Sequence, residues 1–268
     1  MGERAAIDRV EDPVTVSGLR ADLRDLGIGA GDTVLVHASL SAIGWVSGGA
    51  QAVIEALQAA VTEDGTLVMP THTGQYSDPA DWEDPPVPED WQEEIRGSRP
   101  PFHPAVTPSR GVGRIPETFR TVPGAIRSTH PLYSFAAWGA DAERVAGDHP
   151  LDHGLGADSP LGAIYELDGQ VLLLGTGHDT NTSLHLAEYL AAVDTPERTR
   201  TAPVRRAGER VEVEYRDIEL DVSDFEEVGA AFDSTGGCEQ GAVGAAQSRL
   251  CDQRELVDFA VEYFETHR

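Results

Sequence analysis

The sequence of 268 residues contains no lysine, because all 20 of its basic residues are arginine, and these face 46 acidic residues for a net charge of −26. Nucleic-acid binding rests on clustered cations, so this balance argues against a nucleic-acid partner. It also disfavours anionic membrane surfaces. Acid-rich surfaces are typical of proteins from salt-loaded cytoplasms, where the repulsion between carboxylates is screened. We therefore expect a halophilic origin, with most of the charge on solvated surface.

Long apolar segments and cysteine motifs are also lacking. The first residues, MGERAAIDRVEDPV, contain no apolar signal-peptide core, and no apolar run approaches the roughly 20 residues that span a bilayer. We expect a soluble, cytoplasmic protein without a membrane partner. The two cysteines, Cys238 and Cys251, lie outside any CxxC spacing. In a cytoplasmic protein a reduced pair is expected rather than a disulfide.

Three catalytic signatures are missing as well. The sequence has no GxGxxG fingerprint of dinucleotide-binding enzymes and no GxSxG elbow of serine hydrolases. It also has no HExxH motif and no paired Cys/His spacing, so no metal site is expected. A nucleotide-dependent reductase is therefore disfavoured.

Apolar strands that alternate with amphipathic helices predict the fold. The apolar runs 33–37 and 66–70 flank a helical pattern over 50–61, which indicates a parallel βαβ unit. The fully apolar run 170–175 is typical of a central strand. A polar strand pair around 200–220 indicates that the sheet is mixed. We expect a single domain over 1–268 with a three-layer α/β/α fold. Further helices are expected over 17–27, 113–120, 161–167, 181–192, 225–232 and 255–266, and a further strand over 133–138.

Residues 71–108 interrupt this pattern with a long segment rich in proline, acidic residues and tryptophan. An irregular insertion of this length in a compact domain is either disordered or functional. Its two tryptophans favour an ordered loop that covers a substrate.

Four segments in this order resemble the aminoglycoside 3-N-acetyltransferase family: VHASLSAIGWVSGG (36–49), MPT (69–71) followed by Asp-Pro (78–79), TPSRGVGRIPE (107–117) leading to STHP (128–131), and LGTGHDTNTSLHLAE (174–188). The resemblance covers about residues 16–266. It implies an acyltransferase that moves an acetyl group from acetyl-CoA to an amine, in this family the 3-amino group of a deoxystreptamine ring. It also implies an α/β fold unrelated to the GNAT acetyltransferases.

The resemblance implies that His185, in the NTSLH segment, is the general base. The residue follows a strand, at the sheet edge where ligands bind in open α/β folds. An imidazole is well suited to take the proton that an attacking amine loses. Glu188 and Tyr189 lie one turn further on, and either could orient the ring. The alternative is an ordinary histidine packed at the start of a helix.

Acidic residues near the start of the helix at 225 are candidates to support this base. The resemblance implies that carboxylates in this region approach the histidine or bind substrate amines. We expect Asp224 and Glu227 to hold the imidazole tautomer. The alternative is that they complement the helix dipole.

The small-residue loop after His37 offers backbone amides at a strand-to-helix turn, which favours phosphate. The resemblance implies that this loop and the 107–110 segment hold coenzyme A, and Arg110 and Arg114 could pair with its phosphates. His37 itself is expected to be a core residue at a strand end. The expected cofactor-binding residues are Ser39, Leu40, Ser41, Gly44, Gly48, Gly49, Thr107, Ser109 and Arg110.

The substrate pocket is expected to include His72 and His130, each next to a predicted strand. Asp78 resembles an acidic residue by which the family contacts cationic aminosugars, and the alternative is a turn-forming aspartate before Pro79. The expected partner is therefore a small cationic amine, bound by a monomer or a homodimer. Antibiotic resistance is the role that the resemblance implies, but an endogenous aminosugar or a polyamine-like metabolite stays open.

The expected reaction is direct acetyl transfer without an acyl-enzyme. Two other classes stay open. A hydrolase of acyl thioesters would need Ser39 or Ser183 as its nucleophile, and a noncatalytic homologue would bind coenzyme A or a related metabolite without turnover.

Overall fold

The computed structural model describes residues 3–83 and 85–268. A mixed sheet of seven strands in the order β3-β4-β2-β1-β5-β9-β8 forms the centre of this described part. Strand β1 pairs in parallel with β2 and β5, and the outer pairs are antiparallel. The strands are β1 (Thr33–Ala38), β2 (Thr66–Pro70), β3 (Ile126–Arg127), β4 (Phe135–Gly139), β5 (Gln170–Leu174), β8 (Cys238–Val243) and β9 (Ala246–Asp252).

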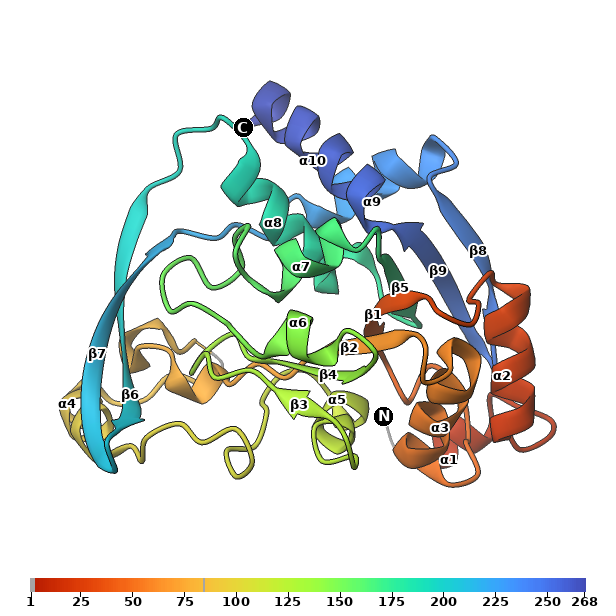
Figure 1. Ribbon diagram of the computed structural model, residues 1–268, viewed down its shortest axis with the longest axis horizontal. Coiled ribbons are helices and arrows are strands. Elements are labelled where there is room, and N and C mark those ends of the chain that lie inside the picture. Colours follow the sequence, from red (N-terminus) through yellow and green to blue (C-terminus); the bar gives the residue numbers. More distant parts are fainter. Residues whose placement is uncertain (1–2, 84) are drawn as a thin grey trace.

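Helices cover both faces of this sheet, as Figure 1 shows. Along β1, Val34 and Val36 belong to one core cluster while Leu35 belongs to the other, because successive side chains of a strand point to opposite faces. One cluster includes α2 (Val16–Asp25), α3 (Gly49–Val61) and α5 (Arg114–Phe119). The other includes α6 (Ala142–Ala146), α7 (Pro160–Glu166), α8 (Ser183–Leu190), α9 (Phe225–Ser234) and α10 (Gln253–His267). The predicted three-layer α/β/α fold with a mixed sheet is confirmed.

The predicted βαβ unit is confirmed in detail. Strands β1 and β2 run parallel, with Leu35 opposite Val68, and α3 connects them. On its other side β1 pairs with β5, where Leu35 lies opposite Val171. All three residues are fully buried, so the apolar runs lie in the middle of the sheet.

The polar strands predicted around 200–220 form a separate hairpin of β6 (Glu197–Arg206) and β7 (Glu209–Ile218). Ala207 and Gly208 close it, both with positive φ angles of 49° and 89°, which matches the right-handed twist of the two strands. Figure 1 shows the hairpin at the left edge of the molecule, beside α4 (Glu89–Ser98).

The insertion over 71–108 is folded against this hairpin. Besides α4 it contains the short 3-10 helices η1 (Gly74–Tyr76) and η2 (Pro79–Asp81). The Arg99 guanidinium donates to the carbonyl oxygens of Gln75 and Ser77 at 3.0 and 2.7 Å. The Phe102 amide donates to the Pro203 carbonyl of β6 at 2.9 Å. These bonds give the insertion a defined shape, although the sequence did not predict α4.

Cys238 and Cys251 form a disulfide between β8 and β9. The prediction of a reduced pair was therefore wrong. The two residues lie directly opposite each other in the antiparallel register, with their Cα atoms 4.3 Å apart. Neither strand is predicted by the sequence pattern, so the pattern could not show that the two cysteines would meet. The remaining described helices are α1 (Glu3–Ile7) and η3 (His178–Thr180), and no described helix is long and apolar enough to cross a membrane.

Candidate functional site

A cleft of about 890 Å³ opens where β1, β2 and β5 end. Carboxyl ends of parallel strands meet at one sheet edge, which is where open α/β sheets bind ligands. The walls come from the loop after β1, from residues 111–116 and from the segment between β5 and α8. His37 and His72 form part of the wall at the strand ends, and Thr182 forms part of it at the start of α8.

His185 lies on the first turn of α8, three residues after Thr182 of the cleft wall, but is not itself among the residues that line the cleft. Asn181 Oδ1 accepts the Ser183 amide at 3.1 Å, and the His185 amide donates to the Thr182 carbonyl at 3.1 Å, so the turn that carries the histidine is fixed. The Phe225 ring packs against the imidazole with 4.9 Å between ring centroids. The side chain is 12% exposed, which leaves one edge open.

Glu188 holds this imidazole from the buried side. His185 Nδ1 lies 2.6 Å from Glu188 Oε2, and the carboxylate side chain is only 1% exposed. The two residues are three apart on α8, a spacing that places side chains on one face. A carboxylate can only accept, so Nδ1 carries the hydrogen and Nε2 keeps its lone pair. This tautomer leaves Nε2 able to accept a proton, as a general base requires.

Asp224 and Glu227, the expected partners of the base, do not contact His185. Asp224 binds Arg268, whose Nη1 reaches the other oxygen of Glu188 at 2.7 Å. Glu227 is exposed and bonds Tyr263, and it raises the pKa of that phenol together with a larger effect of burial. The expectation that these two acids hold the tautomer was wrong, because Glu188 occupies the position. No sequence motif indicated Arg268 as a residue of the site.

His37 and His72 are neutral neighbours of the base. Burial, together with a smaller effect of a positive charge on His185, lowers the pKa of each to about 3. His37 Nε2 lies 3.2 Å from Thr182 Oγ1. The His72 ring packs edge-on against Phe135, with 5.2 Å between centroids. His72 lines the cleft as expected, whereas His37 is both a buried strand-end residue and a part of the cleft wall.

The loop after β1 supplies most of the expected cofactor-binding residues. Gly48 adopts a left-handed φ of 93° and precedes the first turn of α3, where no side chain caps the helix. At the start of the same loop, the Ser39 amide donates to the Leu174 carbonyl of β5 at 2.9 Å. The expected residues of this loop that line the cleft are Ser39, Leu40, Ser41, Gly44 and Gly49.

The 107–110 segment lies beside the cleft rather than on its wall. Ser109 donates to Glu117 through its amide and its hydroxyl, at 2.8 and 2.6 Å. Although burial opposes it, these bonds and those from Arg120 lower the pKa of Glu117 to about 2. Thr107 Oγ1 accepts the His103 amide at 2.9 Å. These hydrogen bonds hold the 107–110 segment in place beside the cleft.

The cleft wall begins just after this segment. The Arg110 guanidinium lies 5.8 Å from the centre of the Trp82 ring, and the residue is not part of the wall. Gly111, Gly113 and Arg114 line the cleft instead. Arg114, rather than Arg110, is therefore the arginine on the cleft wall, and the coenzyme contacts expected at Thr107, Ser109 and Arg110 stay a prediction.

Two of the expected substrate residues have other partners. Asp78 binds Arg96 at 2.7 Å and accepts the Ala80 amide at 2.8 Å, so it caps η2 as a turn aspartate does. His130 is fully buried. Its Nδ1 accepts the Leu132 amide at 3.1 Å, and its Nε2 lies 3.1 Å from the Leu151 carbonyl. The placement of His130 in the substrate pocket was wrong, because both ring nitrogens are bonded to backbone in the core.

One group of described residues brings possible metal ligands together. Donor atoms of His178, Asp233 and Cys238 lie within 4.8 Å of one another. The Cys238 sulfur is bonded to Cys251, and Asp233 pairs with Arg249 at 2.7 Å. Because the cysteine is in a disulfide and the aspartate is in an ion pair, the group has no free thiolate, and we assign no metal to it.

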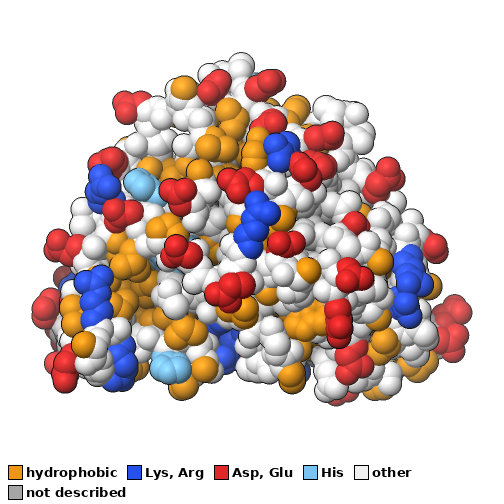
Figure 2. Space-filling view, viewed as in Figure 1, with side chains coloured by type: hydrophobic (Ala, Val, Ile, Leu, Met, Phe, Trp, Pro, Cys, Tyr) orange, Lys and Arg blue, Asp and Glu red, His pale blue; other side chains and the backbone are white. Residues whose placement is uncertain are grey.

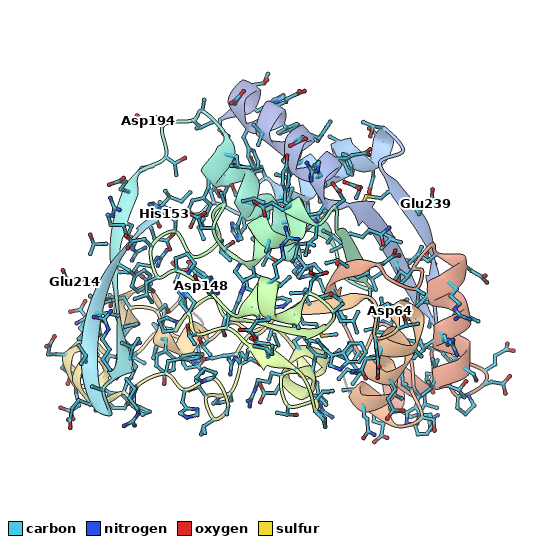
Figure 3. All side chains as sticks on the ribbon, viewed as in Figure 1. Asp64, Asp148, His153, Asp194, Glu214 and Glu239 are labelled. Carbon is cyan, nitrogen blue, oxygen red and sulfur yellow. A yellow bond between two sulfur atoms is a disulfide. The ribbon has the colours of Figure 1, made fainter. Side chains whose placement is uncertain are left out.

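The acidic residues are spread over the surface instead of gathered at the cleft. Figure 2 shows carboxylates over the whole of one face, with few arginines between them. In Figure 3, Asp194, Glu214 and Glu239 lie at the outline of the molecule, and all three are exposed. This distribution agrees with the expectation that most of the charge is solvated.

Comparison with known proteins gives consistent matches. The family model described as aminoglycoside 3-N-acetyltransferase matches residues 35–265. The chain is 47% identical to the prophage-derived aminoglycoside N(3')-acetyltransferase-like protein YokD of Bacillus subtilis, over 94% of this chain and 93% of that protein. It is 38% identical to aminoglycoside N(3)-acetyltransferase VII of Streptomyces paromomycinus, over 99% and 96%.

Solved structures agree with these sequence matches. The crystal structure of YokD superposes with a TM-score of 0.95 at 45% identity, covering 98% of both chains. The structure of AAC-IIIb with CoASH gives a TM-score of 0.85 at 34% identity, over 95% of this chain and 97% of that one. AAC-VIa bound to sisomicin also gives 0.85, at 32% identity, over 96% and 99%. The matches confirm the resemblance drawn from the four segments.

Proposed function

The chain belongs to the aminoglycoside 3-N-acetyltransferase family, and we propose that it transfers the acetyl group of acetyl-CoA to an amino group of an aminoglycoside or a related cationic amine. Family membership confirms the prediction of an acyltransferase. AAC-IIIb binds CoASH and AAC-VIa binds sisomicin, which supports both substrate classes. The single observation that carries the proposal is the hydrogen bond between the buried Glu188 and His185, three residues after Thr182 of the cleft wall.

The proposed chemistry is direct transfer in a ternary complex. The amine nitrogen attacks the thioester carbonyl carbon while His185 Nε2 takes the proton that this nitrogen loses. Glu188 stabilises the imidazolium that forms, as the carboxylate of a catalytic triad does. The new N–C bond forms, the C–S bond breaks, and the coenzyme leaves as a thiol after it receives the proton from His185.

The cleft fits the coenzyme in size and in chemistry. Its volume of about 890 Å³ lies within the usual range for small-molecule sites. We propose that the uncapped first turn of α3 and the Arg114 guanidinium bind the phosphates, because helix N-termini and guanidinium groups both favour such anions. The insertion over 71–108 would then cover the amine, since it begins at His72 on the cleft wall.

The hydrolase alternative fits the serine contacts less well. Ser183 is fully buried, and its Oγ accepts from Gln253 Nε2 at 3.1 Å. Ser39 Oγ lies 3.3 Å from Ser41 Oγ, and Ser41 cannot serve as a base. Neither serine has the histidine partner that would activate it as a nucleophile among its hydrogen bonds in the described part of the chain.

The test of the proposal is thiol release from acetyl-CoA across a panel of aminoglycosides, aminosugars and polyamines. We expect turnover with at least one cationic amine, and a loss of about 10²- to 10⁴-fold in His185→Asn. His267→Asn is the matched control, because His267 is an exposed residue at the end of α10. Wild-type turnover in His185→Asn would refute the assignment of the base. Coenzyme binding by calorimetry without acetylation of any amine would favour the noncatalytic homologue.

We further propose that the protein works in a salt-rich cytoplasm. The excess of 46 acidic over 20 basic residues creates self-repulsion that salt screens. The melting temperature should therefore rise as KCl is increased from about 0.1 to 1 M, where the screening length falls from about 10 to 3 Å. A melting temperature that does not respond to KCl would exclude this explanation of the surface charge.

A further inference from the structure

The side of Glu188 that faces away from His185 is bound by the guanidinium of Arg268. Arg268 Nη1 donates to Glu188 Oε1 at 2.7 Å, and Nη2 donates to the Asp221 carbonyl at 2.8 Å. Nε donates to Asp224 Oδ2 at 2.8 Å. The guanidinium carbon lies 3.7 Å from the centre of the Phe264 ring. The side chain is 18% exposed, so most of it is enclosed by these partners.

These bonds fix the rotation of the Glu188 carboxylate. Its Oε1 accepts both from Arg268 and from the Asp221 amide, the latter at 2.9 Å. Its Oε2 is left for His185. Because the side chain is 1% exposed, water cannot replace a lost donor at low cost. The ionised and oriented state of Glu188 therefore depends on what binds Oε1.

We propose that Arg268 is a positioning residue for the proposed reaction, which acts on His185 through Glu188. It keeps the carboxylate ionised with Oε2 turned to the imidazole, and it ties the segment that contains Asp221 and Asp224 to the end of α10. This inference rests on the proposed function, because it concerns the same base.

The charge of Arg268 also affects how firmly the pair of His185 and Glu188 holds a proton. A cation next to the pair disfavours one more proton on it, whichever partner would carry that proton. The other charged or titratable groups around the pair are Asp221 and Asp224 before α9, His37 on β1 and His72 after β2. Both of these histidines are neutral at working pH. Loss of the Arg268 charge should therefore make the pair keep its proton to higher pH.

The experiment compares Arg268→Met, Arg268→Lys and a matched control, Arg254→Met. Arg254 lies on the same helix, pairs with Asp168 at 2.7 Å and covers the Tyr165 ring at 4.6 Å, so its replacement removes similar contacts at the far end. The assay measures kcat and KM for acetyl-CoA and for the amine from pH 5.5 to 9. Thermal melting of each variant is recorded with the same samples.

In Arg268→Met we expect the acidic limb of the pH profile to move up by about one unit, with both KM values within about threefold of wild type. At pH values on the acidic side of the limb, kcat then falls about tenfold. Arg268→Lys should restore most of the limb position, because it restores the charge. Arg254→Met should keep the wild-type profile even if it melts earlier.

A folded Arg268→Met variant with an unshifted limb would overturn the inference. If that variant does not fold, Arg268→Lys decides, because a lysine cannot reproduce the paired bonds to Glu188 and Asp224 and should lower kcat at unchanged KM. Wild-type kcat in Arg268→Lys would then count against the inference. The two proposals fail separately: activity in His185→Asn removes the proposed function, whereas an inactive His185→Asn with an unshifted Arg268→Met removes only the role of Arg268.

Discussion

Replacement of Glu188 by glutamine tests the tautomer on which the proposed chemistry depends. The substitution keeps the shape of the side chain and removes its charge. In the native structure Oε1 receives donors from Arg268 and from the Asp221 amide, and Oε2 receives the His185 Nδ1–H. A glutamine side chain has one oxygen and one NH₂ group where glutamate has two oxygens. The tautomer of His185 therefore depends on which of these two groups faces the imidazole.

The two donors at Oε1 fix that orientation. If the amide nitrogen of Gln faced Arg268 and the Asp221 amide, three donors would meet in a buried site, at a cost of about 1–3 kcal/mol for each group left unsatisfied. The oxygen therefore stays at that place and the NH₂ group faces His185. Nδ1 must then accept, which moves the ring hydrogen to Nε2. The imidazole is left without a lone pair on its open side.

The expected loss follows from this change of tautomer. An amide in place of the carboxylate of a serine protease triad lowers kcat by about 10⁴-fold through the wrong tautomer. We expect a similar fall of about 10⁴-fold in kcat/KM for Glu188→Gln, which is about 5.5 kcal/mol of transition-state stabilisation. Glu188→Ala should lose less, about 10²-fold, because the ring is then free to choose its tautomer.

The assay is thiol release at saturating acetyl-CoA from pH 6 to 9, with melting curves to confirm that both variants are folded. The diagnostic result is the order of the two variants, with glutamine worse than alanine. A Glu188→Gln variant within about fivefold of wild type, which is under about 1 kcal/mol, would refute the reasoning. An alanine variant worse than the glutamine variant would contradict the tautomer argument and show that the hydrogen-bonding shape of the side chain matters more.

Three further predictions concern other parts of the molecule. Arg114→Gln should raise KM for acetyl-CoA about tenfold, as expected for one lost charge-assisted bond, and leave KM for the amine unchanged; equal effects on both would contradict its phosphate role. Cys238→Ser should lower the free energy of unfolding in urea by about 3 kcal/mol, since the bond to Cys251 closes a loop of 13 residues; an unchanged midpoint in urea would count against this estimate. Because burial lowers the pKa of His37 and His72 to about 3, the folded state resists protonation that the unfolded chain accepts below about 6.5. The free energy of unfolding should therefore fall between pH 6.5 and 3, by up to about 1.4 kcal/mol per unit for each ring, and a flat urea midpoint across this range would contradict it.

The central strands could be predicted because burial on both faces leaves a strong pattern. Strands β1, β2 and β5 are apolar at nearly every position, and only the middle of a parallel sheet needs this. The parallel pairing of β1 and β2 then requires a crossover connection, which α3 supplies. From these elements alone the sheet edge that carries the cleft could be predicted.

The edge of the sheet could not be predicted in the same way. Strand β8 reads CEQGAV and is buried only at its first and last positions, with a glycine in its middle. Such a short polar segment matches a loop as well as it matches a strand. The disulfide depends on the register of this strand with β9, and register is a property of the pairing rather than of either segment.

Of the residues that support the proposed base, the sequence could predict only the one that lies on the same helix. Glu188 was a candidate because its spacing from His185 on α8 places the two side chains on one face. Asp224 was preferred for its place in an acidic cluster, and the cluster does lie close by. Sequence could not show that the side chain of Arg268, 44 residues further on, stands between Asp224 and Glu188.

His72 and His130 show more clearly what the sequence could not predict. His72 follows a strand, His130 precedes one, and both were expected in the same pocket. What separates them is the backbone around each ring. The chain after His130 turns so that the amides of Leu132 and Tyr133 point at Nδ1, and the Leu151 carbonyl meets Nε2, so both nitrogens have partners inside the core. His72 Nε2 is buried without such a partner, and its ring forms part of the cleft wall. A histidine at a strand end is therefore a candidate for chemistry only where the fold leaves a ring nitrogen unbonded, and that condition depends on residues far along the chain.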